Sequence, residues 1–264
     1  MRFAGGMKIA TYNVNGINSR LPVLLRWLAL AKPDIVCLQE LKAPDDRFPE
    51  DAIRDAGYRA VWHGQSRWNG VAILSRAWDI HETRRDLPGH PGDAQSRYIE
   101  AAINGVLVCG LYLPNGNPRP GPKFDYKLQW FERLHDHLAG LVDLDAPVVC
   151  MGDFNVMPTD HDVYAPDRWR DDALFAPEVR EAFFRVLDQG WTDAVRHLHP
   201  DDTVYTFWKY WRGAFERNAG LRIDHALLNP VAAGRLVSGT VDTRPRGWEK
   251  TSDHAPLCIE LTPS

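Results

Sequence analysis

The stretch Pro147–Pro158, which reads PVVCMGDFNVMP, joins an apolar run to two polar residues. The run has the composition of a buried strand, and Asp153 and Asn155 stand at its end, one residue apart. Asp and Asn at the end of a strand usually form a turn, because their side chains bond nearby backbone groups. This stretch alone is as compatible with a turn as with a functional site, so the rest of the sequence has to decide between them.

The length and composition are those of an ordinary globular protein. The chain has 264 residues, of which 44% are apolar and 25% charged, enough for one large sandwich or barrel or for two small domains. No apolar stretch could span a bilayer, which excludes a membrane protein, and the start MRFAGGMK lacks the apolar segment of a secretory signal. No linker or break in composition separates two domains. We therefore expect a disordered N-terminal extension over residues 1–6 and a single domain over residues 7–264.

The cysteines and the charge bear on compartment and partners. All four cysteines lie in apolar runs without the spacing of a metal site, so we expect reduced thiols and a cytoplasmic location. The formal net charge of −4 argues mildly against a protein that coats nucleic acid, although a local basic groove is compatible with it. Basic residues recur in segments that we expect to be loops, where a solvated surface is the plainer interpretation. They are Arg119, Lys123, Lys127, Lys209, Arg212, Arg217, Arg244, Arg246 and Lys250.

Short apolar runs predict strands, and helical spacing interrupts them in three places. The predicted strands cover residues 8–13, 34–40, 70–75, 97–103, 106–114, 147–153, 221–229 and 254–261. Apolar residues spaced as i, i+3, i+4 and i+7 predict helices over 21–28, 124–138 and 179–187, the first with Ser19 as its N-cap. Hairpin-like neighbours within 70–113 and after 221 favour sheets packed on each other with helices outside. The loop 157–177 is long enough to be a candidate functional loop.

Polar side chains stand at the ends of several predicted strands. Besides Asp153 they are Asn13, Asn15, Glu40, Asp224, Asp253 and His254. A sheet can gather such residues from distant parts of the chain at one rim, which makes a site a better interpretation than separate turns. Hard oxygen ligands without thiolates suit Mg²⁺ or Mn²⁺ rather than zinc, and Mg²⁺ usually keeps phosphate oxygens among its ligands, which predicts a phosphate ester as substrate. A positioned imidazolium can stabilise phosphoryl charge while a separate carboxylate activates the attacking water.

Seven motifs make the sequence recognisable. In chain order they read TYNVNG, LQELK, LYLPNG, GDFNV, YTFW, GLRIDH and KTSDHAPL. Together they resemble the exonuclease III family of abasic-site endonucleases, within the endonuclease/exonuclease/phosphatase superfamily, and the resemblance covers roughly residues 7–261. GDFN and SDH mark only the superfamily, which includes phosphoinositide phosphatases, sphingomyelinases and DNase I-like nucleases. LQELK, YLPNG, YTFW and GLRIDH are specific to the DNA-repair branch.

The resemblance implies a fold and answers the question raised by the first stretch. The implied fold is α+β, a DNase I-like four-layer αββα sandwich of two packed mixed β-sheets with the site at one edge of both. Asp153 matches the aspartate that activates water in the family. Asn155 matches an asparagine that binds the phosphate and stabilises the transition state.

Further catalytic and metal-binding positions follow from the same resemblance. Tyr112 and Asn115 match contacts to the phosphate, and His254 matches a phosphate-contacting histidine that Asp224 orients. Glu40 matches the principal ligand of a divalent metal, Mg²⁺ or alternatively Mn²⁺. The full set expected at the metal is Asn13, Glu40, Asp153, Asn155, Asp253 and His254.

Four residues fall where the family builds an apolar pocket for a deoxyribose without a base. They are Phe207, Trp208, Leu221 and Ile223. Such a pocket would exclude a normal nucleotide by size and so give selectivity without reading bases.

The resemblance therefore predicts a metal-dependent DNA repair nuclease. It would cut double-stranded DNA 5′ to abasic sites and trim 3′ ends as a 3′–5′ exodeoxyribonuclease, with the DNA held by loop arginines and lysines. We expect a monomer with no membrane partner. One alternative keeps the site but acts on phospholipids or inositol phosphates as a phosphodiesterase or phosphatase. A second alternative, a binding module without activity, is disfavoured by the complete set of polar residues.

Overall fold

The computed structural model describes residues 6–263 and contains two six-stranded mixed sheets. The first sheet has the strand order β11-β12-β1-β2-β4-β3, in which β1 and β2 are parallel and the other neighbours antiparallel. Its strands are β1 (Met7–Asn13), β2 (Ile35–Gln39), β3 (Arg59–His63), β4 (Val71–Ser75), β11 (Leu236–Val241) and β12 (Leu257–Leu261).

The second sheet has the order β5-β6-β7-β8-β10-β9, with β7 and β8 as its parallel pair. Its strands are β5 (His81–Arg85), β6 (Tyr98–Ile103), β7 (Val106–Tyr112), β8 (Val148–Asp153), β9 (Thr192–Asp193) and β10 (Asp224–Leu228). The stretch PVVCMGDFNVMP thus supplies β8, a central strand that is buried along its whole length.

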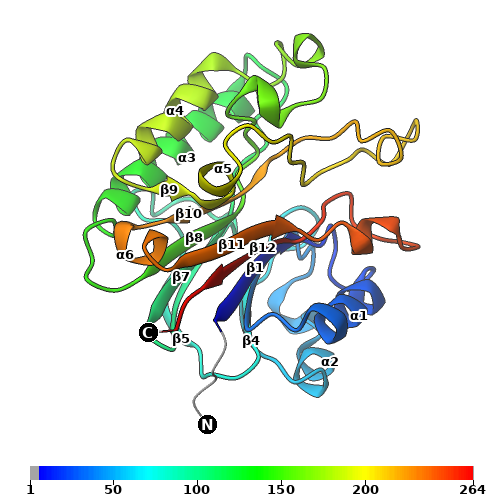
Figure 1. The fold of residues 1–264 in the computed structure, drawn as a ribbon, viewed down its shortest axis with the longest axis vertical. Helices are drawn as coiled ribbons and strands as arrows, with labels where there is room; N and C mark the ends of the chain where they lie inside the picture. Colours follow the sequence, from blue (N-terminus) through cyan, green and yellow to red (C-terminus); the bar gives the residue numbers. More distant parts are fainter. Residues whose placement is uncertain (1–5, 264) are drawn as a thin grey trace.

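Helices cover the two outer faces of the sheets. Figure 1 shows α1 and α2 on one side of the sandwich and α3 and α4 on the other. The helices are α1 (Leu21–Ala31), α2 (Glu50–Asp55), α3 (Pro122–Ala139), α4 (Pro177–Leu187), α5 (Ala194–Leu198) and α6 (Pro230–Ala233), with 3₁₀ turns at Asp45–Arg47, Asp160–Asp162, Pro166–Arg168 and Arg244–Gly247. This arrangement confirms the predicted four-layer αββα sandwich.

Three apolar cores hold the layers together. One core lies between the first sheet and helices α1 and α2, and another between the second sheet and helices α3 and α4. The central core lies between the two sheets and takes side chains from both sheets. Ile9 on β1, Val108 on β7 and Met151 on β8 are fully buried in this central core. Burying side chains of this size stabilises the fold by about 1.5–3 kcal/mol each.

The sequence missed strands at the borders of the sheets. Arg59–His63 and His81–Arg85 are strands at sheet edges. The first has only a three-residue apolar run, over residues 60–62, and the second is exposed throughout and has none. The proposed cap of α1 was also wrong: Ser19 Oγ donates to the Gly16 carbonyl, and Arg20 occupies the N-cap position. The expected N-terminal extension lies, except for Gly6, outside the described residues.

Two further features concern membranes and cysteines. Across residues 6–263, no helix has the length and apolar character needed to cross a bilayer. All four cysteines are buried and unpaired.

Candidate active site

Three strands of the second sheet place three polar side chains in one row. In the register of the sheet, Asp153 at the end of β8 lies beside Tyr112 on β7 and beside Asp224 on β10. Gly152 makes this approach possible, because a Cβ there would lie 1.9 Å from the Leu111 carbonyl oxygen. The residue before Asp153 must therefore be glycine for β8 to reach this position.

The first sheet delivers Asn13 and Glu40 to the same place. Asn13 Nδ2 donates to Glu40 Oε1 at 2.9 Å and to Asp153 Oδ2 at 3.0 Å, so one amide links the acids of both sheets. The Tyr112 hydroxyl also donates to Glu40 Oε1, at 2.9 Å. Glu40 and Asn155 both have left-handed backbone conformations, with φ of 52° and 49°. Such conformations in non-glycine residues persist where the surrounding structure enforces them, commonly at functional sites.

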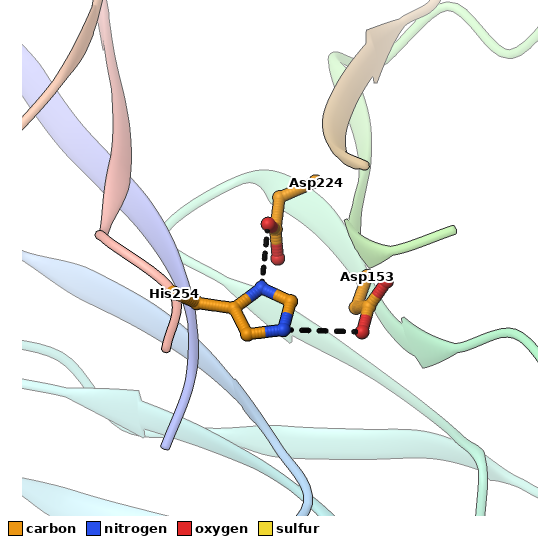
Figure 2. A group of neighbouring side chains, drawn as sticks. All are labelled: Asp153, Asp224 and His254. Atoms are coloured by element: carbon orange, nitrogen blue, oxygen red, sulfur yellow. Dashed lines mark hydrogen bonds and ion pairs between the residues drawn. The ribbon is translucent and has the colours of Figure 1, made fainter. Parts of the chain in front are cut away.

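An imidazole ring lies between two carboxylates, as Figure 2 shows. His254 Nδ1 donates to Asp224 Oδ2 at 2.8 Å, and its Nε2 lies 3.8 Å from Asp153 Oδ2. Burial alone would lower the pKa of His254, but the charge and hydrogen bond of Asp224, aided by Asp153, raise it to about 10. The ring is therefore a cation at neutral pH, and its Nε2 carries a proton that it can donate to a bound group.

The acids of the site differ in their proton affinity. Burial raises the pKa of Asp153, and the negative charges of Asp224 and Glu40 add to the effect while His254 opposes it, giving a value of about 7. Burial also acts against the charge of Glu40, but Lys42 and the Asn13 amide outweigh it and hold the pKa of Glu40 below its usual value. Burial and two neighbouring carboxylates raise the pKa of Tyr112 well above its ordinary value, so its hydroxyl stays a donor.

Two loops at the ends of β7 and β8 fix the asparagine side chains. Asn115 Nδ2 donates to Asn155 Oδ1 at 3.2 Å, and Asn155 Nδ2 donates to the Leu113 carbonyl at 2.8 Å. Lys127 lies beneath both loops, fully buried, and its ammonium donates to the carbonyls of Pro114, Asn115 and Asn155. This role was not predicted: Lys127 was expected among the basic residues of exposed loops, because a lysine normally faces solvent.

The donor set is suited to a divalent cation. Glu40 and Asp153 supply hard carboxylate oxygens that converge on the Asn13 amide. Asp224 Oδ1 is buried and has no hydrogen-bond partner among residues 6–263. Ligand atoms of Asp153, Asp224 and His254 also lie within 4.8 Å of one another, but there the imidazolium already supplies positive charge. The side nearer Glu40 therefore fits a metal better. Asp253 lies further out, where its Oδ1 accepts from Asn15 Nδ2 at 3.0 Å.

A cavity of about 270 Å³ opens next to these polar groups; it is called the catalytic cavity below. Phe207, Leu221 and Ile223 line it, and the Phe207 ring centroid lies 5.0 Å from that of His254. Trp208 does not line it: this side chain is 2% exposed and packs against Tyr205 in a separate apolar cluster. Trp208 points away from the site because consecutive residues of an extended segment face opposite sides. Residues that the sequence did not single out also line the cavity: Asn117, Trp169, Asp172 and Leu174.

Most of the basic residues expected in DNA-binding loops have other positions. Lys123 and Lys127 belong to α3, and Lys127 is buried. Arg246 is 9% exposed and donates to the Trp208 carbonyl, while Arg119 and Arg244 are paired with acids. Lys209, Arg212 and Arg217 remain near the site, beside a second cavity.

Comparison with known proteins gives full-length matches. An exodeoxyribonuclease III from Haemophilus influenzae is 34% identical over 97% of this chain and 100% of its own length. An AP endonuclease from Archaeoglobus fulgidus superposes with a TM-score of 0.93 at 40% identity, covering 97% of this chain and 99% of its own. A 3′–5′ exonuclease from Neisseria meningitidis gives 0.94 at 41% identity, covering 97% and 100%.

The family model described as "Endonuclease/Exonuclease/phosphatase family" matches residues 10–254, from β1 to the histidine of the site. The matched range therefore includes every residue discussed above as part of the candidate active site. With full-length relatives above 30% identity, the chain belongs to the endonuclease/exonuclease/phosphatase family, in its exodeoxyribonuclease III and AP endonuclease branch.

Proposed function

We propose that this enzyme hydrolyses the DNA phosphodiester bond 5′ to abasic sites and removes nucleotides or blocking groups from 3′ ends. The observation that carries the proposal is the row of Tyr112, Asp153 and Asp224 beside an apolar cavity lined by Phe207 and Leu221. Phosphate chemistry and a pocket for a sugar without a base then lie side by side. The named activities of the relatives support the same assignment.

The chain's own residues can take the proton of the attacking water and stabilise the charge that develops on the phosphate. The Asp153 carboxylate, with a pKa of about 7, would take the proton of the attacking water. The His254 imidazolium, held by Asp224, would donate a hydrogen bond to a phosphate oxygen and stabilise the charge that develops there. Asn155 and Tyr112 would supply neutral donors to the same phosphate.

A divalent cation completes the proposed site. The family depends on divalent metals, and for this chain we propose Mg²⁺, with Mn²⁺ as a substitute, held by Glu40 and Asp153 with the Asn13 and Asn155 side chains close by. When bound, it would polarise the phosphate and offset the charge of the acids. Asp253 and His254 would act from further out, the histidine as a cation and not as a ligand, since a protonated imidazole has no free lone pair.

The proposal extends to the partner of the enzyme, its domain organisation and its location. Double-stranded DNA is the proposed partner, and we propose that residues 7–264 act as one domain and as a monomer. Four buried, unpaired cysteines support a reducing, cytoplasmic location.

One assay tests the proposal. A duplex oligonucleotide with a single tetrahydrofuran residue, an abasic analogue, is incubated with the enzyme and Mg²⁺, Mn²⁺ or EDTA. Incision at the analogue with either metal, and none with EDTA, is expected. Asp153→Asn should fold normally, bind this duplex at least as well, and lose about 10²- to 10⁴-fold in rate. Hydrolysis of inositol phosphates or phospholipids without incision of DNA would overturn the proposal.

A further inference from the structure

A second cavity, of about 290 Å³, lies next to the catalytic cavity. It opens between the segments 164–172 and 207–221. Trp169, Asp172, Phe207, Lys209 and Leu221 line both cavities, so the two share a wall. A ligand in the second cavity would therefore be an immediate neighbour of a group bound at the active site.

The second cavity carries uncompensated positive charge. Arg168, Lys209, Arg212 and Arg217 line it, and within residues 6–263 none of these four side chains forms an ion pair. The nearby Arg119 and Arg170, by contrast, are paired with Glu178 and Asp167. Asp172 is the one acid in the lining, and its Oδ1 already accepts from Asn117 and from the Leu174 amide. In a chain with a net charge of −4, such a concentration of cations points to an anionic ligand.

Aromatic rings surround these cations. Lys209 Nζ lies 4.4 Å from the ring centroid of Trp169 and 5.6 Å from that of Trp211. Trp211 is 59% exposed and Tyr164 41%, although large aromatic side chains are normally buried. Indole rings combined with unpaired arginines are the composition with which proteins hold unstacked nucleic acid bases.

We propose that the second cavity binds one unstacked nucleotide of the DNA strand, the immediate neighbour of the nucleotide held in the catalytic cavity. The base would stack on Trp169, which lines both cavities, and Arg212 and Arg217 would contact the adjoining phosphates. A base inside a duplex has both faces covered, so it can enter only after leaving the stack. The enzyme should consequently prefer lesions whose neighbouring nucleotide is already unpaired. This inference rests on the proposed function, because the register of the DNA is set by the abasic residue.

Binding in EDTA tests the inference without cleavage. Five duplexes each carry a tetrahydrofuran residue. In the reference both neighbouring nucleotides are paired; in two duplexes the 3′ or the 5′ neighbour is mispaired; in the last two a second tetrahydrofuran replaces the 3′ or the 5′ neighbour. Dissociation constants are measured by fluorescence anisotropy. On one of the two sides, a mispaired neighbour should lower the dissociation constant at least about fivefold relative to a paired neighbour. The mispaired base can stack on the indole ring of the cavity without the free-energy cost of opening a base pair. The double tetrahydrofuran duplexes keep their phosphates but have no base to stack, so they should lose this gain.

Variants of the cavity separate the roles of charge and stacking. Arg212→Gln/Arg217→Gln should reduce the slope of log Kd against log salt by about 1.4, at about 0.7 for each phosphate contact of a single strand. Trp169→Leu should reduce the gain from mispairing to less than about twofold. Arg84→Gln removes one positive charge, half of what the double variant removes, from an exposed position on β5 and should behave as the wild type.

The outcomes distinguish failure of the inference from failure of the proposed function. The inference would be overturned if the wild type bound duplexes with paired and mispaired neighbours equally well on both sides. It would also be overturned if Trp169→Leu kept the full gain in affinity from mispairing and Arg212→Gln/Arg217→Gln kept the wild-type dependence of log Kd on log salt. A wild type that neither prefers tetrahydrofuran over intact DNA nor cuts it with Mg²⁺ would overturn the proposed function itself.

Discussion

Lys127 offers a sharp test of how the active site is held together. Its ammonium is fully buried and donates to the carbonyls of Pro114 at 3.1 Å, Asn115 at 3.2 Å and Asn155 at 2.6 Å. It thereby ties the loop after β7 to the loop after β8. We expect Lys127→Met, an apolar side chain of similar length, to reduce catalysis while the protein still folds.

The expected stability change follows from two opposed effects. Burial lowers the pKa of Lys127 to about 7 from its usual 10.5, which at about 1.4 kcal/mol per pKa unit corresponds to about 5 kcal/mol against the buried charge. Methionine removes this penalty. It also leaves the buried carbonyls of Pro114 and Asn155 and the partly buried carbonyl of Asn115 without this donor, at up to about 3 kcal/mol each. The difference is a destabilisation of at most about 4 kcal/mol, so the variant should fold and its Tm should fall by less than about 15 °C.

An effect on catalysis is expected because the positions of Asn155 and Asp153 depend on the tie. Without the Lys127 ammonium, the Asn155 carbonyl loses the shortest of the three hydrogen bonds that Lys127 donates. The backbone that carries the Asn155 and Asp153 side chains then becomes free to shift. A displacement of about 1 Å at an active site can reduce the rate about 100-fold. We therefore expect kcat on the tetrahydrofuran duplex to fall about 10- to 100-fold, with a smaller change in KM.

Single-turnover cleavage and thermal unfolding, measured on the same preparations, check this prediction. Lys123→Met is the matched control, because Lys123 lies one turn earlier on α3 and is exposed; it should retain both rate and Tm. A Lys127→Met enzyme that keeps its rate within about threefold of the wild type would refute the reasoning. Loss of rate together with a fall in Tm well beyond 15 °C would show that Lys127 acts on the fold as a whole.

Three further predictions concern other parts of the molecule. Phe207→Ala should reduce cleavage at the tetrahydrofuran residue more than trimming of an ordinary 3′ end, because Phe207 lines the proposed sugar pocket; equal losses in the two assays would reduce its role to packing. Asp224→Asn removes the charge that holds the His254 ring at 2.8 Å and should lower kcat about 10- to 100-fold with little change in KM, whereas a KM effect alone would contradict an orienting role. Burial opposes the charge of Glu100, but hydrogen bonds from His137, Thr83 and Tyr98 lower the pKa of Glu100 to about 2. Because the pKa of Glu100 is lower in the folded state, this group stabilises the protein above about pH 4.5, and the contribution is lost as the pH falls toward 2. Glu100→Gln should lower the free energy of unfolding in urea by up to about 3 kcal/mol at pH 7. If the difference in unfolding free energy between variant and wild type did not shrink below pH 4.5, these hydrogen bonds would not be the cause.

The sequence predicted the central strands and failed at the edges for a physical reason. Strands such as β1, β2 and β8 are buried on both faces, so their apolar runs are continuous and easy to find. The edge strand β5 has five exposed residues and is formed by pairing with β6, a contact that no local pattern encodes.

The same distinction explains the outcome at the candidate site. Asp153 and Glu40 were found because acids directly after buried strands stand out in the sequence. Lys127 was expected in an exposed loop but lies buried on α3. Helical spacing cannot distinguish a lysine that faces solvent from one whose ammonium reaches beneath a loop. Trp169 and Leu174 were not singled out, because their place in the cavity depends on how the segment 157–177 folds back toward Leu221, a contact between distant parts of the chain.

Glu40 and Asp153 differ in pKa because each has a different cation beside it, a difference that the sequence does not reveal. Lys42 Nζ lies 2.8 Å from Glu40 Oε2 and keeps that acid ionised despite its burial. The nearest cation to Asp153 is His254, at 3.8 Å, and the surrounding acids leave the pKa of Asp153 at about 7. An acid that is always charged at neutral pH suits the binding of a metal, whereas an acid that titrates near 7 can take a proton from water and release it again. Both acids are proposed to hold the metal, and both follow a buried strand, so it is the environment and not the residue type or the position in the sequence that makes Asp153 alone the proposed base.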